Sequence, residues 1–426
     1  MTRKAYTIGY GQGTRSFWLD DDRLLLEMKA AEPDNEPDQT EEVISAIKNP
    51  IGKPPLKEWL LPGDRVCIVT SDITRPCPSS IILPPLIDEL EDAGVRAEDI
   101  TIVFALGSHR RHTEEEKRRL VGDRVYNRVH TVDSDPDDTV YLGMTSFGTP
   151  VNITESVAQA DRRICVGNIE YHYFAGYSGG AKALMPGVSN RESIQANHSR
   201  MIEPTSRAGA IEGNRLRMDL EEAADICGCD FIVNVILNEE KRIVKAVAGD
   251  HRLAHRVGCA FLDSLYKIPI DRQADLVIAT PGGLPKDINL YQTQKALDNA
   301  QHAVRPGGII VLAGQCAEGY GEAVFEEWLL AAAKPMDLIE RVKREFRLGG
   351  HKAVAIAMVL AKADVYFVSD MPAEQVAHTF MRPYDDLGQA VDDALLKLGP
   401  EAKVIIMPHA GSTLPEYKPA FHQNER

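Results

Sequence analysis

The stretches RVCIVT at 65–70 and ITIVFAL at 100–106 decide the fold of this chain of 426 residues. Both are short, mostly apolar runs with many β-branched residues, which are typical of buried strands. The segment that follows Ser79, between the two runs, has the apolar spacing of a helix. A strand, a helix and a second strand in this order predict a parallel sheet with helices on its faces. The sequence therefore indicates an α/β protein.

The same alternation continues toward the C-terminus. Further predicted strands, which alternate with helical segments, are RRICVG (162–167), FIVNVIL (231–237), ADLVIAT (274–280), GGIIVLAG (307–314), ADVYFVSD (363–370) and AKVIIMP (402–408). Because single cores stop growing at about 250–300 residues, this length predicts two domains. We place the boundary near Pro269, which gives domains 1–268 and 269–426, each a mostly parallel sheet flanked by helices, with the last ~20 residues packing back on the first domain.

Composition and charge exclude several classes of protein. With 44% hydrophobic and 26% charged residues, the chain has the composition of a globular protein. Its net charge of −15 repels phosphate backbones and anionic lipid, so we expect neither nucleic acid nor a membrane as a partner. The seven cysteines are scattered and form no Cys-x-x-Cys pair, and the N-terminus lacks the apolar segment of an export signal. We therefore expect a cytoplasmic protein that binds a small molecule.

Polar and glycine-rich segments follow four of the predicted strands. They are SDITRP (71–76), GSHRRHT (107–113), NIEYHYFAGYSGGAKALMPG (168–187) and PGGLPKDINLYQTQK (281–295). Mostly parallel sheets bind ligands at the carboxyl ends of their strands. Because these loops come from both halves of the chain, we expect the active site in the cleft between the two domains.

The loops carry histidines and cations suited to acid/base chemistry. A single histidine is more often structural, but His109, His172 and His198 on neighbouring loops would supply two proton carriers and one metal ligand. His198 is predicted to end a helix and has no Cys or carboxylate at matching spacing, so the other donors to a metal would have to come from a cofactor. Lys182 is a phosphate contact, a nucleophile or an exposed loop residue. Arg75, held extended by the following proline, forms either an ion pair with Asp72 or a contact to a substrate carboxylate.

Two further interpretations stay open at this point. The stretch 176–180 (GYSGG) fits the G-x-S-x-G pattern of serine hydrolases, with Ser178 as the nucleophile. The predicted strand ends at Gly167, however, so Ser178 does not lie on a strand-to-helix elbow, and no HGGG-type oxyanion loop precedes it. Alternatively, Gly179 and Gly180 turn the chain so that its amides face a phosphate, as in a non-catalytic nucleotide-binding or metal-binding protein.

Five of these segments together resemble one known family. SDITRP, ALGSHR, YHYFAGYSGGAKALMPG with the following NHS, and GGLPKDINLYQTQKAL are similar to the nickel-dependent lactate racemase family, in the same order and over nearly the whole chain. The resemblance implies an isomerase that racemises or epimerises a 2-hydroxy acid. It also implies a nickel-pincer nucleotide, a pyridinium dithiocarboxylate-type mononucleotide with nickel, which separate cofactor-synthesis enzymes supply.

The resemblance also implies a role for each matching residue. The nickel ligand would be His198, the covalent attachment point of the cofactor Lys182, and the paired acid/base groups His109 and His172. The substrate-binding residues would be Arg75, Gln292 and Lys295, and the residues that hold the cofactor would be Asp72, Gly179, Gly180, Pro186 and Gly187. In the implied mechanism, one histidine removes the proton of the 2-hydroxyl while hydride leaves C2. The hydride then returns to the other face, and the second histidine returns a proton.

Two departures from the family concern the substrate. Position 351 is histidine where lactate-specific members carry a bulky aromatic residue nearby, and positions 110–112 read Arg-Arg-His. These additional cations would favour a 2-hydroxy acid with a second anionic or polyhydroxyl end, such as a dicarboxylic or sugar acid.

Overall fold

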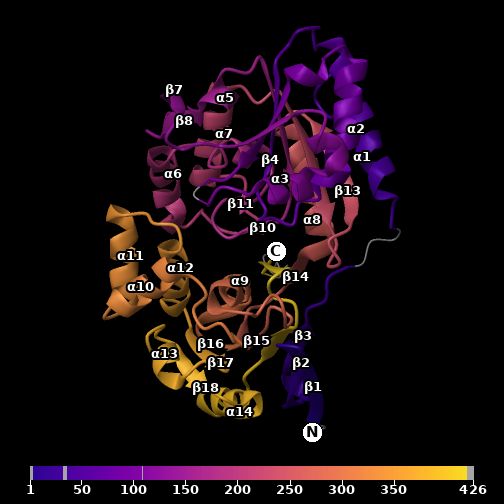
Figure 1. The fold of residues 1–426 in the computed structure, drawn as a ribbon. Helices are drawn as coiled ribbons and strands as arrows, with labels where there is room; N and C mark the ends of the chain where they lie inside the picture. The colour runs from indigo at the N-terminus through magenta and orange to yellow at the C-terminus, as the bar shows by residue number, and fades with distance from the viewer. Residues whose placement is uncertain (1–2, 32–35, 108, 420–426) are drawn as a thin grey trace, which may run out of the picture. The chain divides into compact units, whose positions relative to one another are not determined.

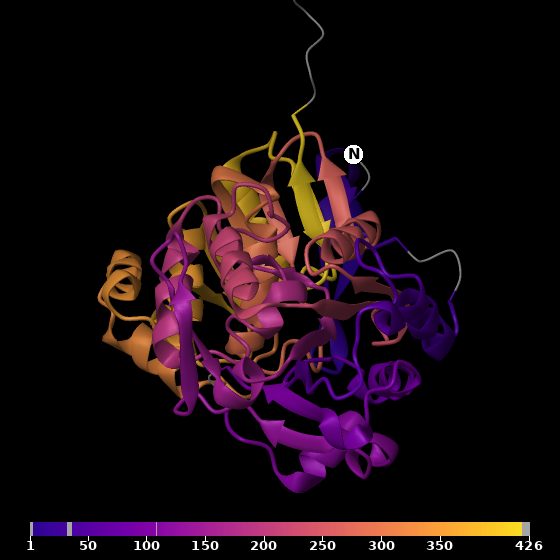
Figure 2. The same ribbon diagram turned by 90° about the horizontal axis from the view of Figure 1, so that it is seen from above.

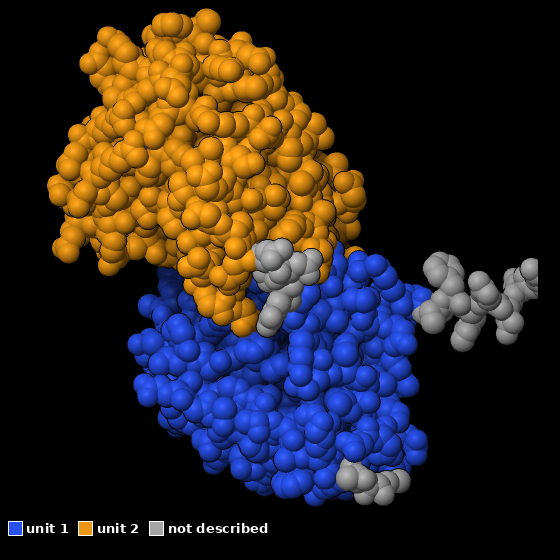
Figure 3. All heavy atoms as spheres, turned by 90° about the vertical axis from the view of Figure 1, so that its right-hand side faces the viewer, with its two compact units in different colours: residues 1–31, 266–426 blue, residues 32–265 orange. Residues whose placement is uncertain are grey.

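The computed structural model describes residues 3–31, 36–107 and 109–419, and divides into two compact units. Unit 1 comprises residues 1–31 and 266–426, and unit 2 comprises residues 32–265 (Figure 3). Each unit contains one six-stranded sheet that is mostly or wholly parallel. The predicted α/β class, with two sheets flanked by helices, is confirmed.

The sheet of unit 2 has the strand order β13-β12-β9-β4-β5-β6. Its strands are β4 (Val66–Ser71), β5 (Ile100–Ala105), β6 (His130–Asp133), β9 (Arg162–Asn168), β12 (Phe231–Leu237) and β13 (Ile243–Gly249). All neighbouring pairs are parallel except β12 and β13, which form an antiparallel edge. Two antiparallel hairpins accompany the sheet: β7 (Thr139–Met144) with β8 (Pro150–Thr154), and β10 (Tyr171–His172) with β11 (Gly176–Tyr177).

Helices bury the sheet of unit 2. They are α1 (Gln39–Lys48), α2 (Ser79–Asp92), α3 (Glu114–Val121), α4 (Asp123–Tyr126), α5 (Glu155–Ala158), α6 (Arg191–His198), α7 (Arg215–Cys227) and α8 (Leu253–Tyr266). Alternate residues of the strands, such as Ile100, Ile102 and Phe104, pack in one core with α1 and α2, which lie side by side in Figure 1. This period of two places the intervening residues on the opposite face of the sheet.

Unit 1 contains a wholly parallel sheet in the order β18-β17-β16-β15-β19-β3. Its strands are β3 (Leu24–Glu27), β15 (Ala274–Ala279), β16 (Val304–Ala313), β17 (Asp364–Val368), β18 (Arg382–Tyr384) and β19 (Val404–Met407). The helices are α9 (Leu290–Ala300), α10 (Ala323–Ala331), α11 (Pro335–Arg344), α12 (Gly350–Leu360), α13 (Ala373–Ala377) and α14 (Leu387–Leu398). Within the described ranges of both units, no helix combines the length and apolarity needed to cross a bilayer.

The N-terminal segment belongs to unit 1, whereas the sequence analysis placed it in the first domain. The antiparallel hairpin of β1 (Arg3–Tyr10) and β2 (Gly13–Asp20) packs its apolar face on the core of unit 1, and β3 pairs in parallel with β19. The predicted boundary near Pro269 lies close to the observed division at residue 265. The local sequence pattern predicts a strand but does not show which strand it pairs with. The pairing of an N-terminal strand with a sheet formed mainly by the C-terminal residues therefore could not be predicted.

The described part of the last 20 residues also belongs to unit 1. Strand β20 (Leu414–Tyr417) pairs in parallel with β14 (Lys267–Ile270), and the two strands lie side by side in Figure 2, in yellow and salmon. Residues 420–426, on which the rest of this prediction falls, lie outside the described residues.

Candidate active site

Three adjacent strands of unit 2, β9, β4 and β5, end in the loops that carry most of the predicted site residues. Their carboxyl ends lie at one edge of the sheet because the three strands are parallel. The loop after β5 is joined to the loop after β9 by a backbone hydrogen bond from Gly107 N to Gly187 O, 2.8 Å long. Two segments about 80 residues apart are therefore held together at this edge.

Asp72 and His109 form a close pair across the first two loops. His109 Nδ1 lies 2.5 Å from Asp72 Oδ2, and the hydroxyl of Thr74 donates to Asp72 Oδ1 at 2.9 Å. Burial by itself raises the pKa of Asp72, but the hydrogen bond and charge of His109, the Thr74 hydroxyl and the charge of Arg75 together lower it. The ionised carboxylate therefore holds a proton on His109 Nδ1, which makes Nε2 the nitrogen that exchanges protons.

The arrangement distinguishes between the two interpretations of Arg75. Asp72 is paired with His109, whereas Arg75 is exposed and acts on the carboxylate through its charge. An exposed guanidinium at a strand end is able to bind a substrate carboxylate, and this role of Arg75 stays a prediction.

His112 supports this pair, and the sequence analysis assigned it only as an additional cation. It is buried, donates from Nδ1 to Asp133 Oδ1 at 2.6 Å and accepts the backbone N–H of Ile73 at Nε2, 3.1 Å away. A histidine that donates at one nitrogen and accepts at the other is neutral. His112 thus ties the loop after β5 to the loop after β4, next to Asp72. The signal in the sequence was the pair of histidines three residues apart, at 109 and 112.

Three more of the predicted site residues, His172, His198 and Lys182, lie around the ring of Phe174. Its centroid lies 4.4 Å from the His172 ring and 4.8 Å from the His198 ring, with both pairs edge to face. The Lys182 Nζ lies 5.6 Å from the same centroid. His172 comes from β10, His198 from the last residue of α6, and Lys182 from the short helical turn Gly180–Ala183. The structure therefore brings together the proposed proton carrier, nickel ligand and attachment point.

A hydrogen bond to His172 indicates which of its ring nitrogens carries the proton. The backbone N–H of Ala175 donates to His172 Nδ1 at 3.3 Å, so a neutral His172 carries its proton on Nε2. This is the opposite tautomer to that of His109, which carries its proton on Nδ1.

The environment of Lys182 favours an uncharged amine. Burial lowers its pKa well below the usual value, and the charges of Arg75 and Arg217 lower it further, against an opposing effect of Glu170. The uncharged form of an amine is a nucleophile, whereas an ammonium ion is not. The influence of Arg75 also shows that the loop after β4 lies near Lys182.

The glycines before Lys182 are required by the backbone. Gly179 and Gly180 have φ values of +73° and +57°, and a Cβ at Gly179 would lie 2.8 Å from Asn234 Oδ1. The N–H of Gly180 donates to the same oxygen at 2.7 Å. Their conformation therefore fits a tight turn into the 180–183 segment, as predicted, while a role in holding a phosphate stays a prediction.

Ser178 is bonded as a structural residue. Its hydroxyl donates to Asn168 O at 2.8 Å and accepts the N–H of Glu170 at 2.9 Å. His255 contacts the backbone carbonyl of Ser178 at 2.8 Å. Nucleophilic serines are activated by a base at the hydroxyl, so this geometry does not favour the hydrolase interpretation.

A buried charged cluster beneath this loop was not predicted. Arg217 and His255 are fully buried, and the guanidinium donates to Tyr177 O at 3.1 Å, to Glu221 Oε1 at 2.6 Å and to His255 Nδ1 at 3.1 Å. Burial lowers the pKa of His255 well below its usual value, with Arg217 adding to the shift, so the imidazole is neutral. The sequence shows Arg217 as one of many charges on a helix, and nothing local distinguishes it.

Gln292 and Lys295 lie in the first two turns of α9 in unit 1, as predicted. Asn289 caps this helix by accepting the N–H of Gln292 at 3.1 Å. Gln292 is partly exposed and Lys295 is exposed. The two residues share one helix face at a spacing of three. Their joint action with Arg75, and an active site between the domains, stay predictions.

The additional cations noted in the sequence have protein partners. Arg110 forms an ion pair with Glu116 at 2.6 Å, and Arg111 with Asp135 at 2.5 Å. His351 is buried at the start of α12, where it accepts the N–H of Gly349 at 3.0 Å and contacts the Phe346 ring. These pairings weaken the argument that the cations select a substrate with a second anionic end.

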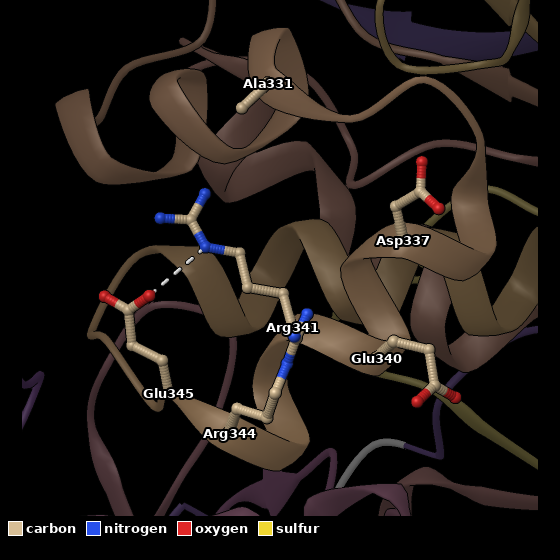
Figure 4. Close-up of a pocket in the computed structure, with 6 residues that line it drawn as sticks. All are labelled: Ala331, Asp337, Glu340, Arg341, Arg344 and Glu345. Atoms are coloured by element: carbon tan, nitrogen blue, oxygen red, sulfur yellow. Dashed lines mark hydrogen bonds and ion pairs between the residues drawn. The ribbon is translucent and has the colours of Figure 1, made fainter.

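A surface hollow in unit 1 lies among α10, α11 and the residues after α11. Its lining, labelled in Figure 4, is Ala331, Asp337, Glu340, Arg341, Arg344 and Glu345. The dashed line joins Arg341 to Glu345, and Arg341 also pairs with Glu327. None of the predicted site residues lines this hollow. Across residues 3–31, 36–107 and 109–419, no group of three His, Cys, Asp or Glu side chains is arranged to hold a metal ion.

Comparison with known proteins independently tests the family resemblance seen in the sequence. Residues 10–209 match the family model described as the lactate racemase N-terminal domain, and residues 270–414 match the lactate racemase C-terminal domain. A lactate racemase of Thermoanaerobacterium thermosaccharolyticum is 33% identical over 419 residues, which cover 96% of this chain and 98% of that protein. A lactate racemase of Lactiplantibacillus plantarum is 33% identical over 417 residues, with coverage of 95% and 98%.

Solved structures agree with these relatives. The lactate racemase apoprotein of T. thermosaccharolyticum superposes with a TM-score of 0.89 at 30% identity, over 97% of this chain and all of the other. A Thermotoga maritima protein shares the fold alone, with a TM-score of 0.65 at 16% identity over 90% of this chain. With both domains matched in order and the relatives matched over almost their full length, the chain belongs to the lactate racemase family of isomerases.

Proposed function

We propose that this isomerase interconverts the two stereoisomers of a small 2-hydroxy acid, lactate, with His109 and His172 as its alternating base and acid. The relatives named above are lactate racemases, which supports lactate as the substrate. The pairing of the additional cations with carboxylates of the chain favours lactate over a dicarboxylic or sugar acid.

The placement of the two histidines in loops that follow parallel strands of one sheet, with Asp72 against His109, carries the proposal. A racemase needs one group that accepts a proton and one that donates it, on two sides of the reacting carbon. The hydrogen bond to Asp72 gives neutral His109 a lone pair at Nε2, and the hydrogen bond from Ala175 N–H gives neutral His172 a proton at Nε2. Neutral His109 can therefore accept the proton of the 2-hydroxyl, whereas His172 must enter the cycle as the imidazolium, because a neutral ring that gave up its Nε2 proton would become an imidazolate. After one turnover His109 carries the additional proton and His172 is neutral, which is the arrangement needed for the reverse direction.

Asp72 assists the histidine that accepts the proton. When His109 Nε2 takes the proton of the 2-hydroxyl, the ring becomes positively charged, and the buried carboxylate at 2.5 Å stabilises that charge. Arg75, Gln292 and Lys295 would hold the substrate carboxylate while the two faces of C2 are exchanged.

The residues around Phe174 fit a nickel-pincer nucleotide. In the described residues no group of three or more His, Cys, Asp or Glu side chains could hold a metal by itself, which suits a cofactor that brings its own donors to His198. The lowered pKa of Lys182 suits covalent attachment of an acyl-type group. When bound, this cofactor would supply an acceptor for the hydride of C2, while Gly179, Gly180, Pro186 and Gly187 would line its place.

The test is the racemisation of L-lactate in deuterated buffer by enzyme produced in a host that makes the cofactor. We expect D-lactate that retains its C2 hydrogen, with one nickel bound per active chain. His109→Gln and His172→Gln should each abolish turnover, whereas His130→Gln, at an exposed position of β6, should not. Nickel-loaded protein that leaves lactate unchanged would refute the proposed substrate, and deuterium at C2 of the product would refute hydride transfer.

A further inference from the structure

Asn197, which precedes the proposed nickel ligand on α6, has an amide whose orientation is fixed by its surroundings. The residue is completely buried, and its Nδ2 donates to Leu216 O at 3.1 Å and to Asp219 Oδ2 at 2.8 Å. A peptide carbonyl and a carboxylate can only accept hydrogen bonds. The NH₂ group must therefore face α7, and the amide oxygen must face the other way.

That oxygen contacts the ring of His198. Asn197 Oδ1 lies 3.0 Å from His198 Nδ1. Because an amide oxygen cannot donate, His198 must carry a proton on Nδ1, and the neutral ring then has its lone pair at Nε2. The edge-to-face contact with Phe174 further restrains the ring. A metal-binding histidine commonly has its second nitrogen fixed in this way by a neighbouring acceptor.

Asp219 is itself held rigidly. It is completely buried on α7 and accepts the hydroxyls of Thr145 at 2.6 Å and Thr149 at 2.7 Å, at the turn between β7 and β8. With three donors placed around it, the carboxylate cannot rotate without breaking at least one hydrogen bond. These hydrogen bonds thereby link the His198 imidazole to α6, α7 and the β7–β8 turn.

We propose that Asn197 is a positioning residue that sets the tautomer of His198, so that Nε2 is the nitrogen offered to nickel. The inference rests on the proposed function for the identity of the metal, but the tautomer itself is a property of the chain alone. In the sequence, Asn197 stands out only as part of the segment NHS and has no assigned role, and Asp219, Thr145 and Thr149 do not stand out at all.

The experiment is ¹⁵N NMR of histidine-labelled apoprotein, with the His198 signals assigned by comparison with His198→Gln. We expect the signature of a protonated Nδ1 and an unprotonated Nε2 in the wild-type protein. Asn197→Ala should lose this selection, so that a substantial fraction of His198 carries its proton on Nε2. Protein from a cofactor-producing host should then hold nickel about 10- to 100-fold more weakly, as measured by its loss to a chelator.

Asn190→Ala is the matched control. Asn190 caps the N-terminus of the same helix by accepting the N–H of Ser193 at 2.9 Å, whereas His198 is the last residue at the other end of this helix. Its removal weakens the helix but should leave the tautomer unchanged, which separates positioning from a general structural role. An Nε2–H tautomer in wild-type protein, or an unchanged Nδ1–H tautomer in Asn197→Ala, would overturn the inference. A wild-type enzyme with the expected tautomer that binds no nickel would instead refute the proposed function.

Discussion

Replacement of Asp72 by asparagine tests whether this carboxylate acts on the proton chemistry of His109. The resemblance to the family assigns Asp72 to the cofactor, whereas the structure places its carboxylate 2.5 Å from His109 Nδ1. Asparagine keeps the shape of the side chain and removes its charge. We therefore expect the rate per bound nickel to fall, because the imidazolium that forms during turnover loses its counter-charge.

The size of the effect follows from the burial of the pair. Hydrogen bonds to charged groups contribute about 1.5–3 kcal/mol, and each 1.36 kcal/mol changes a rate about tenfold. The expected loss of kcat is therefore about 10- to 150-fold. A full Coulomb interaction at ~4 Å and an effective dielectric constant of ~20 amounts to about 4 kcal/mol, which sets a ceiling near a thousandfold. Asp72 is only 2% exposed, so added salt should change the loss little.

The assay follows the conversion of L-lactate to D-lactate, with the rate divided by nickel content. The lowered pKa of Asp72 keeps the wild-type carboxylate ionised over about pH 5–8, so the two rates are compared at one pH within that range. Asp135→Asn, which removes a carboxylate that pairs with an exposed arginine, is the control and should change the rate less than about twofold. An Asp72→Asn enzyme within threefold of wild type per nickel, or one whose entire loss is explained by missing nickel, would refute the reasoning.

Three further predictions concern stability. Gly179→Ala should lower the free energy of unfolding by about 2–4 kcal/mol, from positive φ and the clash with Asn234. Gly213→Ala, with φ +72° and nothing within 4 Å, should cost only about 1–2 kcal/mol in the same denaturant titration; equal losses would contradict the packing argument. Ser178→Ala should destabilise by about 1–3 kcal/mol, and the wild-type residue should stay unlabelled by a fluorophosphonate, so a labelled Ser178 peptide in mass spectrometry would restore the hydrolase interpretation. Burial raises the pKa of Asp298 from 3.8 to about 7, so the folded state keeps a proton that the unfolded chain releases. The stability that Asp298 contributes is fully present below pH 3.8 and should be lost as the pH rises toward 7, by at most about 1.4 kcal/mol per pH unit. Asp298→Asn should flatten this slope in unfolding curves measured at several pH values.

Much of the fold could be predicted because its signals are local. Each buried parallel strand is a continuous apolar run, and RVCIVT, ITIVFAL and RRICVG all correspond to observed strands. The loops that follow them hold the site residues because parallel strands end at a common edge. The N-terminal strands were assigned to the wrong unit, since pairing between β3 and β19 joins segments almost 400 residues apart.

For the candidate site, too, some features could be predicted from the sequence and others only from the structure. The sequence by itself points to the residues that are proposed to carry the chemistry: the histidines at 109, 172 and 198 and Lys182 stand out because of their types and the loops they occupy. Only the tertiary structure decided their protonation and their partners, such as Asp72 for His109, Asn197 for His198 and Arg217 beneath the glycine turn. The reason is physical: tautomers, lowered pKa values and buried charges depend on which groups approach within about 3 Å. Those approaches are made between distant segments, and no local pattern encodes them.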